Sequence, residues 1–133
     1  MRHQRLMKKF GRSTAHRKAL MRSLVTNLII AESIETTLPK AKQARKDAEK
    51  MVTIARKGTL AARRLAASRL YKPEAVQKLF DTIVPALEGR NGGYTRIVKT
   101  DARRGDGGEM AILQWVYVAD KNAKPVVEAE EVK

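Results

Sequence analysis

The chain has 133 residues, a formal net charge of +14 and no cysteine. A chain of this length fits one domain with its own core, and the absence of cysteine excludes disulfides, thiolate metal sites and cysteine nucleophiles. Histidine occurs only at His3 and His16, which argues against a histidine metal site or a hydrolytic triad. A basic excess of this size indicates a polyanionic partner.

The positive charge lies in the first half of the chain. Residues 1–72 hold 19 Lys and Arg against 4 Asp and Glu, a net charge of +15, whereas residues 73–133 have a net charge of −1. We therefore expect a basic arm over residues 1–12, a globular domain over residues 13–118 and a disordered tail over residues 119–133. No apolar run approaches the ~20 residues of a membrane-spanning helix, so no membrane partner is expected.

The first element predicted in the globular domain is a helix that starts at Ser13 or Thr14 and ends near residue 31. Its apolar stripe recurs every four residues, at Leu20, Leu24 and Leu28, and is flanked by Met21, Val25 and Ile29. Residues 33–38 then alternate apolar and polar side chains, many of them β-branched, which is typical of a short strand.

Three further helices are predicted in the middle of the chain. Pro39 opens the first of them, and its apolar residues recur at steps of three and four: Ala41, Ala44, Ala48, Met51 and Ala55. Gly58 suits the end of that helix, and Thr59 suits the start of another over residues 60–70. The last helix begins at Pro73, is ended or bent by Pro85, and is expected to bury Val76, Leu79, Phe80 and Ile83.

The last part of the chain reads as a hairpin. Residues 94–100 and 110–118 alternate or are apolar like strands, and a Gly- and Arg-rich turn separates them. We expect Tyr94, Trp115 and Tyr117 to pack in the core rather than to stack on nucleobases. The elements together predict an α/β protein of the α+β type, with four or so helices packed on a small sheet and a C-terminal hairpin.

Catalytic chemistry is not indicated by any motif. Residues 89–93 are Gly-rich but lack the spacing of a phosphate-binding loop. Three acidic residues lie in the predicted turn, but their spacing does not match a calcium-binding loop: Asp101, Asp106 and Glu109. Arg103 and Arg104 lie between them in the sequence and would repel a cation. We therefore expect no enzymatic activity, no cofactor, no metal and no small-molecule substrate.

The bases near the start of the first helix indicate an anion site. Arg17, Lys18 and Arg22 lie where the helix dipole disfavours cations, and a bound phosphate would reverse that penalty. The alternative is a solvated basic face that only keeps the chain soluble. Since Phe, Trp and Tyr make up 5% of the chain, an aromatic platform for single strands is disfavoured, and recognition of structured RNA by its backbone fits better.

Several stretches resemble signatures of one known family. They are Met-Arg-His at residues 1–3, Gly-Arg-Ser-Thr-Ala-His-Arg-Lys-Ala at 11–19, Ile-Glu-Thr-Thr-Leu-Pro-Lys-Ala-Lys at 34–42 and Asn-Gly-Gly-Tyr-Thr-Arg-Ile at 91–97. In this order they resemble the bacterial-type large-subunit ribosomal proteins of the L-seventeen family. An Arg-rich start also fits an organelle transit peptide, but the resemblance argues against one because signature residues lie inside it.

The resemblance implies helices on a small mixed three-stranded sheet with a basic N-terminal extension. It implies a structural constituent of the large ribosomal subunit, in the cytoplasm or in an organelle with bacterial-type ribosomes. The implied partners are large-subunit ribosomal RNA and neighbouring ribosomal proteins near the exit of the peptide tunnel. A DNA-associated architectural or regulatory protein is the alternative that the charge leaves open.

The basic residues and the matching motifs together give the candidate RNA-binding residues. They are Arg2, His3, Arg5, Lys8, Lys9, Arg12, Ser13, His16, Arg17, Lys18, Arg22, Lys40, Lys42, Arg45, Arg63, Arg64, Arg90, Arg96, Arg103 and Arg104.

Overall fold

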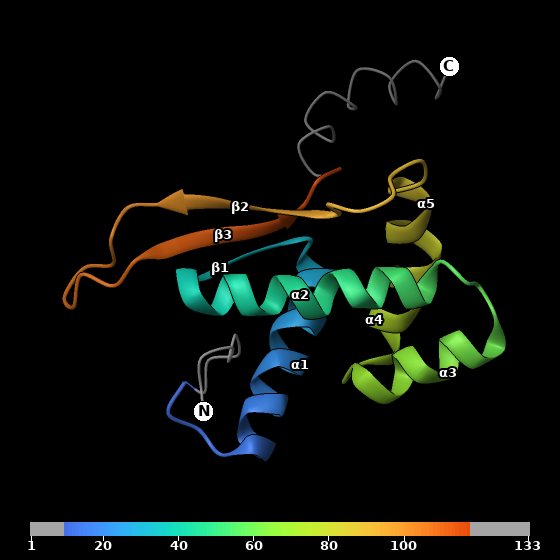
Figure 1. Ribbon diagram of the computed structural model, residues 1–133, viewed down its shortest axis with the longest axis horizontal. Helices are drawn as coiled ribbons and strands as arrows, with labels where there is room; N and C mark the ends of the chain where they lie inside the picture. Colours follow the sequence, from blue (N-terminus) through green and yellow to red (C-terminus); the bar gives the residue numbers. More distant parts are fainter. Residues whose placement is uncertain (1–9, 118–133) are drawn as a thin grey trace, which may run out of the picture.

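The computed structural model describes residues 10–117 and has an α+β fold, as predicted. The helices are α1 (Thr14–Ala31), α2 (Leu38–Ala55), α3 (Leu60–Arg69) and α4 (Pro73–Lys78), and α4 continues through a π-helical turn η1 (Leu79–Ile83) into α5 (Val84–Ala86). The strands are β1 (Ser33–Thr37), β2 (Thr95–Thr100) and β3 (Met110–Trp115). The helices gather beside the sheet, and the β2–β3 hairpin extends past the first turn of α2, away from α3 and α5 (Figure 1).

The sheet is antiparallel throughout, so the expectation of a mixed sheet is wrong. Its strand order is β1-β3-β2, and both edge strands pair with β3 in antiparallel register. The hairpin fixes the opposite directions of β2 and β3, and β1 runs in the same direction as β2. A mixed sheet would require β1 to lie beside β2, but the central position of β3 separates them.

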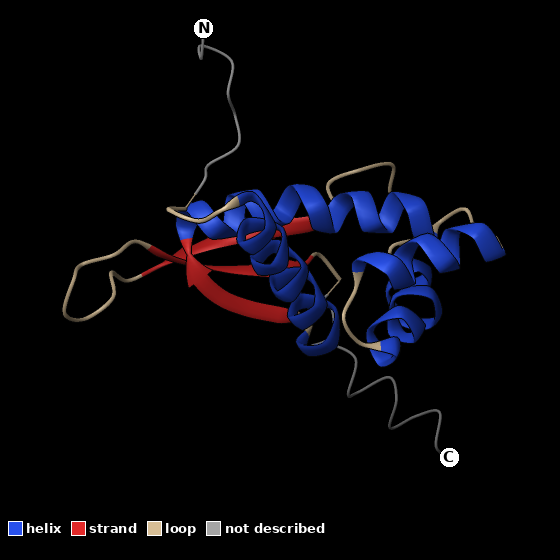
Figure 2. Cartoon of the chain, turned by 90° about the horizontal axis from the view of Figure 1, so that it is seen from below, coloured by secondary structure: helices blue, strands red, loops and turns tan. Residues whose placement is uncertain are grey.

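One face of the sheet is covered by α1 and α2 and forms the core (Figures 1 and 2). Ile34, Leu113 and Ile97 lie opposite one another across the three strands, and Leu113 is fully buried. Trp115 is also fully buried, and its indole Nε1 donates a hydrogen bond to the carbonyl of Leu28 at 3.2 Å. This bond satisfies the polar atom of the largest side chain in the core. Tyr94 and Tyr117 are buried as predicted.

The small-residue stripe of α2 is confirmed as its buried face. All five predicted residues are at most 3% exposed: Ala41, Ala44, Ala48, Met51 and Ala55. The short side chains let α1, α3 and all three strands pack against this one helix. Because this stripe faces the core, the charged residues of α2 lie on either side of it.

The buried face of α1 is centred on the flank of the predicted stripe. Its buried apolar side chains are Met21, Val25, Leu28 and Ile29, whereas Leu20 and Leu24 are only partly buried. A strict four-residue step rotates by about 40° per step around a helix of 3.6 residues per turn. Leu20 and Leu24 therefore lie at the edge of the contact surface, and the flanking Met21, Val25 and Ile29 are buried together with Leu28.

This difference predicts unequal effects of leucine truncation in α1. Leu28→Ala should lower the free energy of unfolding by about 2–5 kcal/mol, because Leu28 is fully buried. Leu24→Ala should cost clearly less, since Leu24 is only partly buried. Chemical denaturation of both variants measures this, and equal losses would contradict the observed orientation of α1.

The fourth predicted helix ends at Ala86, one residue after Pro85, so the expectation that Pro85 ends or bends it is confirmed. Proline lacks an N–H and its ring crowds the preceding turn. Just before Pro85 the helix forms the π-helical turn η1, in which the N–H of Val84 donates a hydrogen bond to the carbonyl of Leu79. In this segment Leu79 and Ile83 are buried, but Phe80 is only partly buried, contrary to expectation.

The predicted helix starts are confirmed, and two strands end earlier than predicted. Ser13 and Thr59 cap α1 and α3 through their side-chain oxygens. Leu38 begins α2 rather than ending β1, and β3 ends at Trp115 rather than at residue 118. Residues 1–9 of the expected arm and the tail after residue 118 lie outside the described residues. Phe10, assigned to the arm, packs against the core.

A cluster of polar side chains joins the end of α1 to α4 and to the segment after β3. Lys78 Nζ donates to the carbonyl of Ile30 at 2.7 Å and lies 3.2 Å from a carboxylate oxygen of Glu32. Tyr117 is buried and makes a hydrogen bond with Glu32; its burial, followed by the nearby Glu32 carboxylate, raises the pKa of the phenol well above 10.0. The cluster stabilises the turn at Glu32, whose φ is 70°.

The Tyr117 pKa predicts how stability changes in alkali. A phenol whose pKa is higher in the folded protein contributes stability that is complete below the unfolded pKa, near 10, and is lost as the pH rises above it. Tyr117→Phe should therefore flatten the fall of the free energy of unfolding above pH ~10. Urea denaturation at several alkaline pH values checks this, and parallel curves for both proteins would contradict it.

Candidate nucleic-acid interface

The exposed start of α1 is electropositive. The Ser13 hydroxyl accepts a hydrogen bond from the backbone N–H of His16 at 3.3 Å, and no acidic residue lies in this first turn. Arg12 donates to the carbonyl of Phe10 at 2.7 Å, and Arg17 donates to the carbonyl of Arg12 at 3.3 Å. These bonds hold two guanidinium groups beside the positive end of the helix dipole, an arrangement that suits an anion.

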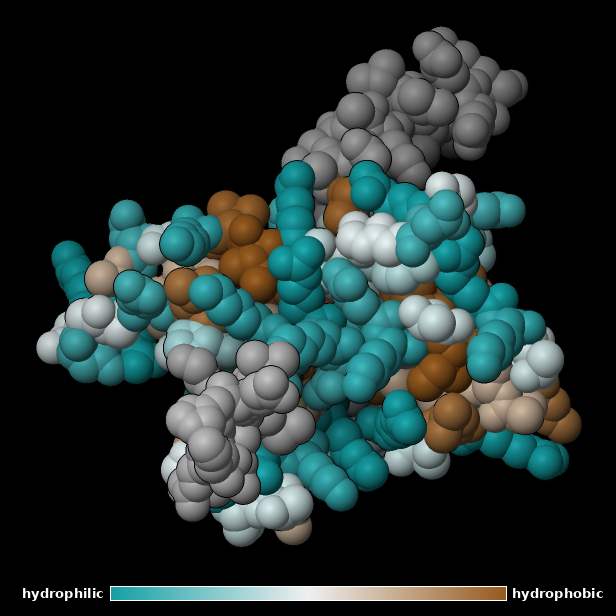
Figure 3. All heavy atoms as spheres, viewed as in Figure 1, coloured by the Kyte–Doolittle hydropathy of each residue, from teal (hydrophilic) through white to brown (hydrophobic). Residues whose placement is uncertain are grey.

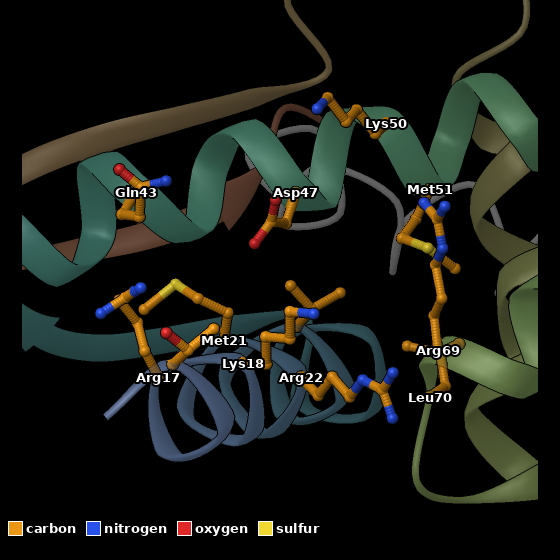
Figure 4. Close-up of a pocket in the computed structure, with 12 residues that line it drawn as sticks. Arg17, Lys18, Met21, Arg22, Gln43, Asp47, Lys50, Met51, Arg69 and Leu70 are labelled. Carbon is orange, nitrogen blue, oxygen red and sulfur yellow. The ribbon is translucent and has the colours of Figure 1, made fainter. Parts of the chain in front are cut away.

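A groove of about 610 Å³ runs between α1 and α2, with the end of α3 beside it (Figure 4). We call it the α1–α2 groove. Five bases line it: Arg17, Lys18 and Arg22 from α1, Lys50 from α2 and Arg69 from α3. Bases from three separate elements therefore line one groove, and this concentrates positive potential.

One carboxylate, that of Asp47, lies among the residues that line this groove. Burial raises the pKa of Asp47, and the positive charges of Lys50, Arg69 and Lys46 oppose that rise. Figure 4 shows the side chain extending from α2 toward α1. The groove thus combines basic side chains with one partly buried carboxylate and the buried amide of Gln43.

A second groove of about 690 Å³ lies between α2 and β2. Its bases are Lys42, Arg45, Lys46 and Lys99. The Arg45 Nε lies 3.4 Å from a carboxylate oxygen of Glu49, which also accepts a 2.8 Å hydrogen bond from the Thr95 hydroxyl. Glu49 therefore ties α2 to β2 and offsets part of the charge of Arg45.

The flanks of α2 thus carry bases on both sides of its buried stripe. Lys40 lies half-buried in the first turn of the same helix. Figure 3 shows mostly hydrophilic residues over α2, whereas hydrophobic residues gather around α3. Leu60 and Leu65 of α3 are exposed.

The candidate bases of α3 and of the loop before β2 are exposed, and two of them have contacts within the protein. The Arg63 guanidinium lies over the Phe80 ring, 4.5 Å from its centre, so it also covers a partly buried aromatic side chain. Arg64 is exposed on the same helix. The backbone carbonyl of Arg90 accepts a 2.6 Å hydrogen bond from the Arg56 guanidinium, and the Arg90 side chain is exposed. The hydrogen bond holds the backbone at Arg90 in place.

The hairpin places its arginines apart from the two grooves. Arg96 lies on the face of β2 opposite the core, paired in register with Gln114. Arg103 forms an ion pair with Asp106 at 2.5 Å, and its hydrogen bond holds the pKa of that carboxyl far below its usual range. Arg103 therefore braces the loop, and Arg104 is exposed beside it.

Five candidate residues of the predicted arm lie outside the described residues: Arg2, His3, Arg5, Lys8 and Lys9. Among those described, the structure brings the bases of α1 into one groove, which spacing along one helix could not show. The predicted candidate residues do not include Lys50 and Arg69 of that groove or Lys46 and Lys99 of the second. A signal existed for Arg69, because it follows buried Ala66 by three residues and directly precedes buried Leu70.

The described part of the chain offers neither a cluster of metal ligands nor a membrane-spanning helix. Across residues 10–117, no group of three or more His, Cys, Asp and Glu side chains is placed to hold a metal ion. None of the helices described there is long and apolar enough to cross a membrane.

The small α+β domain with basic grooves belongs to a known class of proteins. The profile described as ribosomal protein L17 matches residues 20–116. The large ribosomal subunit protein bL17 of Koribacter versatilis (strain Ellin345) is 55% identical over 114 residues, which cover 86% of this chain and 71% of the relative. That of Desulforamulus reducens is 54% identical over 109 residues, covering 82% and 97%, and that of Chlorobaculum parvum is 47% identical over 131 residues, covering 98% and 85%.

The chain therefore belongs to the ribosomal protein L17 family, and the family that its motifs resemble is confirmed.

Proposed function

We propose that this protein is a structural constituent of the large ribosomal subunit that binds ribosomal RNA and has no catalytic role. Its relatives are named large ribosomal subunit proteins, and the match extends over most of the chain. The observation that supports RNA binding most directly is the convergence of five bases on the α1–α2 groove, beside the exposed start of α1. Phosphates bound there would neutralise charges that otherwise repel one another.

The candidate residues contribute in different ways in this proposal. The exposed bases of α1 and of both flanks of α2 bind phosphates, and the hairpin arginines reach a separate part of the RNA. The basic arm over residues 1–12 adds further phosphate contacts. On the family resemblance, we place the protein near the exit of the peptide tunnel beside neighbouring large-subunit proteins, in the cytoplasm or in an organelle with bacterial-type ribosomes.

A competition assay separates this function from binding to DNA in an architectural or regulatory role. A labelled fragment of large-subunit ribosomal RNA is bound to the full chain at physiological salt, and unlabelled competitors are added at equal nucleotide concentration. We expect the same RNA to displace the probe at far lower concentration than duplex DNA does. Equal displacement by the two competitors would contradict a specific role in the ribosome.

A further inference from the structure

The floor of the α1–α2 groove differs chemically from its rim. Met21, Val25, Met51 and Leu70 line the groove and are each at most 7% exposed. The Asp47 carboxylate extends into the same space from α2 (Figure 4). The lining also includes the buried amide of Gln43, which offers a donor and an acceptor but no charge. A phosphate needs positive charge, and apolar side chains, an amide and a carboxylate supply none. The bases at the rim supply it.

A nucleobase matches the floor better than a phosphate does. Its flat, weakly polar rings can lie against methionine sulfur, which makes favourable contacts with aromatic rings. Its edge carries N–H donors, and an ionised carboxylate is purely an acceptor. The groove volume of about 610 Å³ falls within the usual range for pockets that bind small ring systems. Unstacked bases of RNA loops and bulges are commonly read in this way.

The carboxylate also discriminates among the four bases. Guanine presents two adjacent donors, N1–H and N2–H, which match the two oxygens of a carboxylate. Adenine and cytosine present a single exocyclic amino group beside ring acceptors. Uracil presents one N–H between two carbonyl oxygens, which would face the oxygens of Asp47.

We propose that the α1–α2 groove binds one unstacked guanine of an RNA, with the base on the apolar floor against Asp47 and the adjoining phosphates on Arg22 and Arg69 at the rim. The proposal rests on the proposed RNA-binding function and names the nucleotide that this groove reads. Arg22 and Arg69 are exposed, and in Figure 4 both lie at the same end of the groove.

The state of Asp47 in the free protein supports this role. Among residues 10–117, no base lies within ion-pair distance of its carboxylate, although three basic side chains act on it at longer range. Burial raises the pKa of Asp47, so its carboxylate is incompletely solvated before RNA binds. Two N–H donors of guanine would supply hydrogen bonds that the partly buried carboxylate cannot receive from solvent.

Short RNAs test the proposal directly. The full chain is titrated with a uracil hexanucleotide and with three variants that carry one central guanine, adenine or cytosine, and binding is followed by fluorescence anisotropy. The guanine RNA should bind about fivefold or more tightly than the other three. In the NMR spectrum of methyl-labelled methionine, this RNA should shift the methyl signals of Met21 and Met51, with Met110 of β3 as the internal control.

Variants assign the preference to the carboxylate. Asp47→Asn should abolish the guanine preference, because it places an N–H donor opposite the donors of guanine. It should tighten binding of the uracil hexanucleotide, since a negative charge that faces the carbonyl oxygens of uracil is lost. The matched control is Asp81→Asn, which removes an exposed carboxylate in η1 and should leave the preference intact.

The two proposals fail in different ways. Equal affinity for the four hexanucleotides, or unshifted Met21 and Met51 signals with the guanine RNA, would overturn the guanine site while binding of large-subunit ribosomal RNA persists. Loss of binding to that ribosomal RNA itself would contradict the proposed function instead.

Discussion

Replacing Lys18 and Arg22 together with glutamine should weaken binding to large-subunit ribosomal RNA and reduce its dependence on salt. Both residues line the α1–α2 groove, and both are exposed. Each lost phosphate contact should lower the slope of log Kobs against log salt concentration by about 0.7–0.9. The double variant should therefore change the slope by between one and two, measured by filter binding across a range of salt concentrations.

A double variant of equal charge provides the control. Lys57 and Lys72 are exposed and line neither groove. Lys57→Gln with Lys72→Gln removes the same net charge, so it should leave the slope almost unchanged if contacts rather than overall charge decide binding. Identical slopes for the two double variants would show that the groove is not the phosphate site.

Replacing Trp115 with alanine should cause the largest loss of stability of any single core substitution considered. The side chain is fully buried between the sheet and α1, and its Nε1–H bonds to the Leu28 carbonyl. Truncation should lower the free energy of unfolding by about 3–5 kcal/mol, through the lost burial and the cavity that remains. This is a large fraction of the roughly 5–15 kcal/mol that holds an ordinary domain folded. Urea denaturation followed by circular dichroism measures it.

An exposed aromatic residue gives the matched control. Tyr71 is 53% exposed, so Tyr71→Ala should change the free energy of unfolding far less. Trp115→Phe should fall between the two, because a smaller ring keeps most of the burial and loses the indole N–H. Similar losses for Trp115→Ala and Tyr71→Ala would contradict the central place of Trp115 in the core.

Much of the local structure could be predicted from the sequence because it depends on neighbours along the chain. The alanine steps of α2 match one helix face, and Ser13 and Thr59 carry side chains that satisfy helix N–H groups. The β2–β3 hairpin follows from two adjacent strands and a glycine-rich turn. Pro85 predicted that the fourth helix ends or bends there, since proline cannot donate the expected bond, and the helix ends at Ala86.

The parts that the sequence did not determine depend on contacts between distant segments. Whether β1 pairs with β2 or β3 decides the sheet type, and both pairings satisfy the alternation of residues 33–38. The exact rotation of α1 depends on how α2 and the sheet meet it, so the sequence could not show that the flanking Val25 is more deeply buried than Leu24.

The candidate interface could likewise be predicted only in part. Basic residues near the start of α1 were identifiable because they lie together in the chain, at a helix end that favours anions. The groove itself was not, since it needs α1, α2 and the end of α3 to meet. Arg69 and Asp47 acquire their place only through that packing.

Sedimentation tests most directly whether this protein is a constituent of the large ribosomal subunit. Lysate of the cells that produce the protein is separated on a sucrose gradient at low magnesium, which dissociates the subunits, and the chain is quantified in every fraction by mass spectrometry. We predict that it peaks with the large subunit, at about one copy per subunit, and stays there after a wash at moderate salt. Recovery at the top of the gradient, with the small subunit or with DNA would contradict a place in the large subunit.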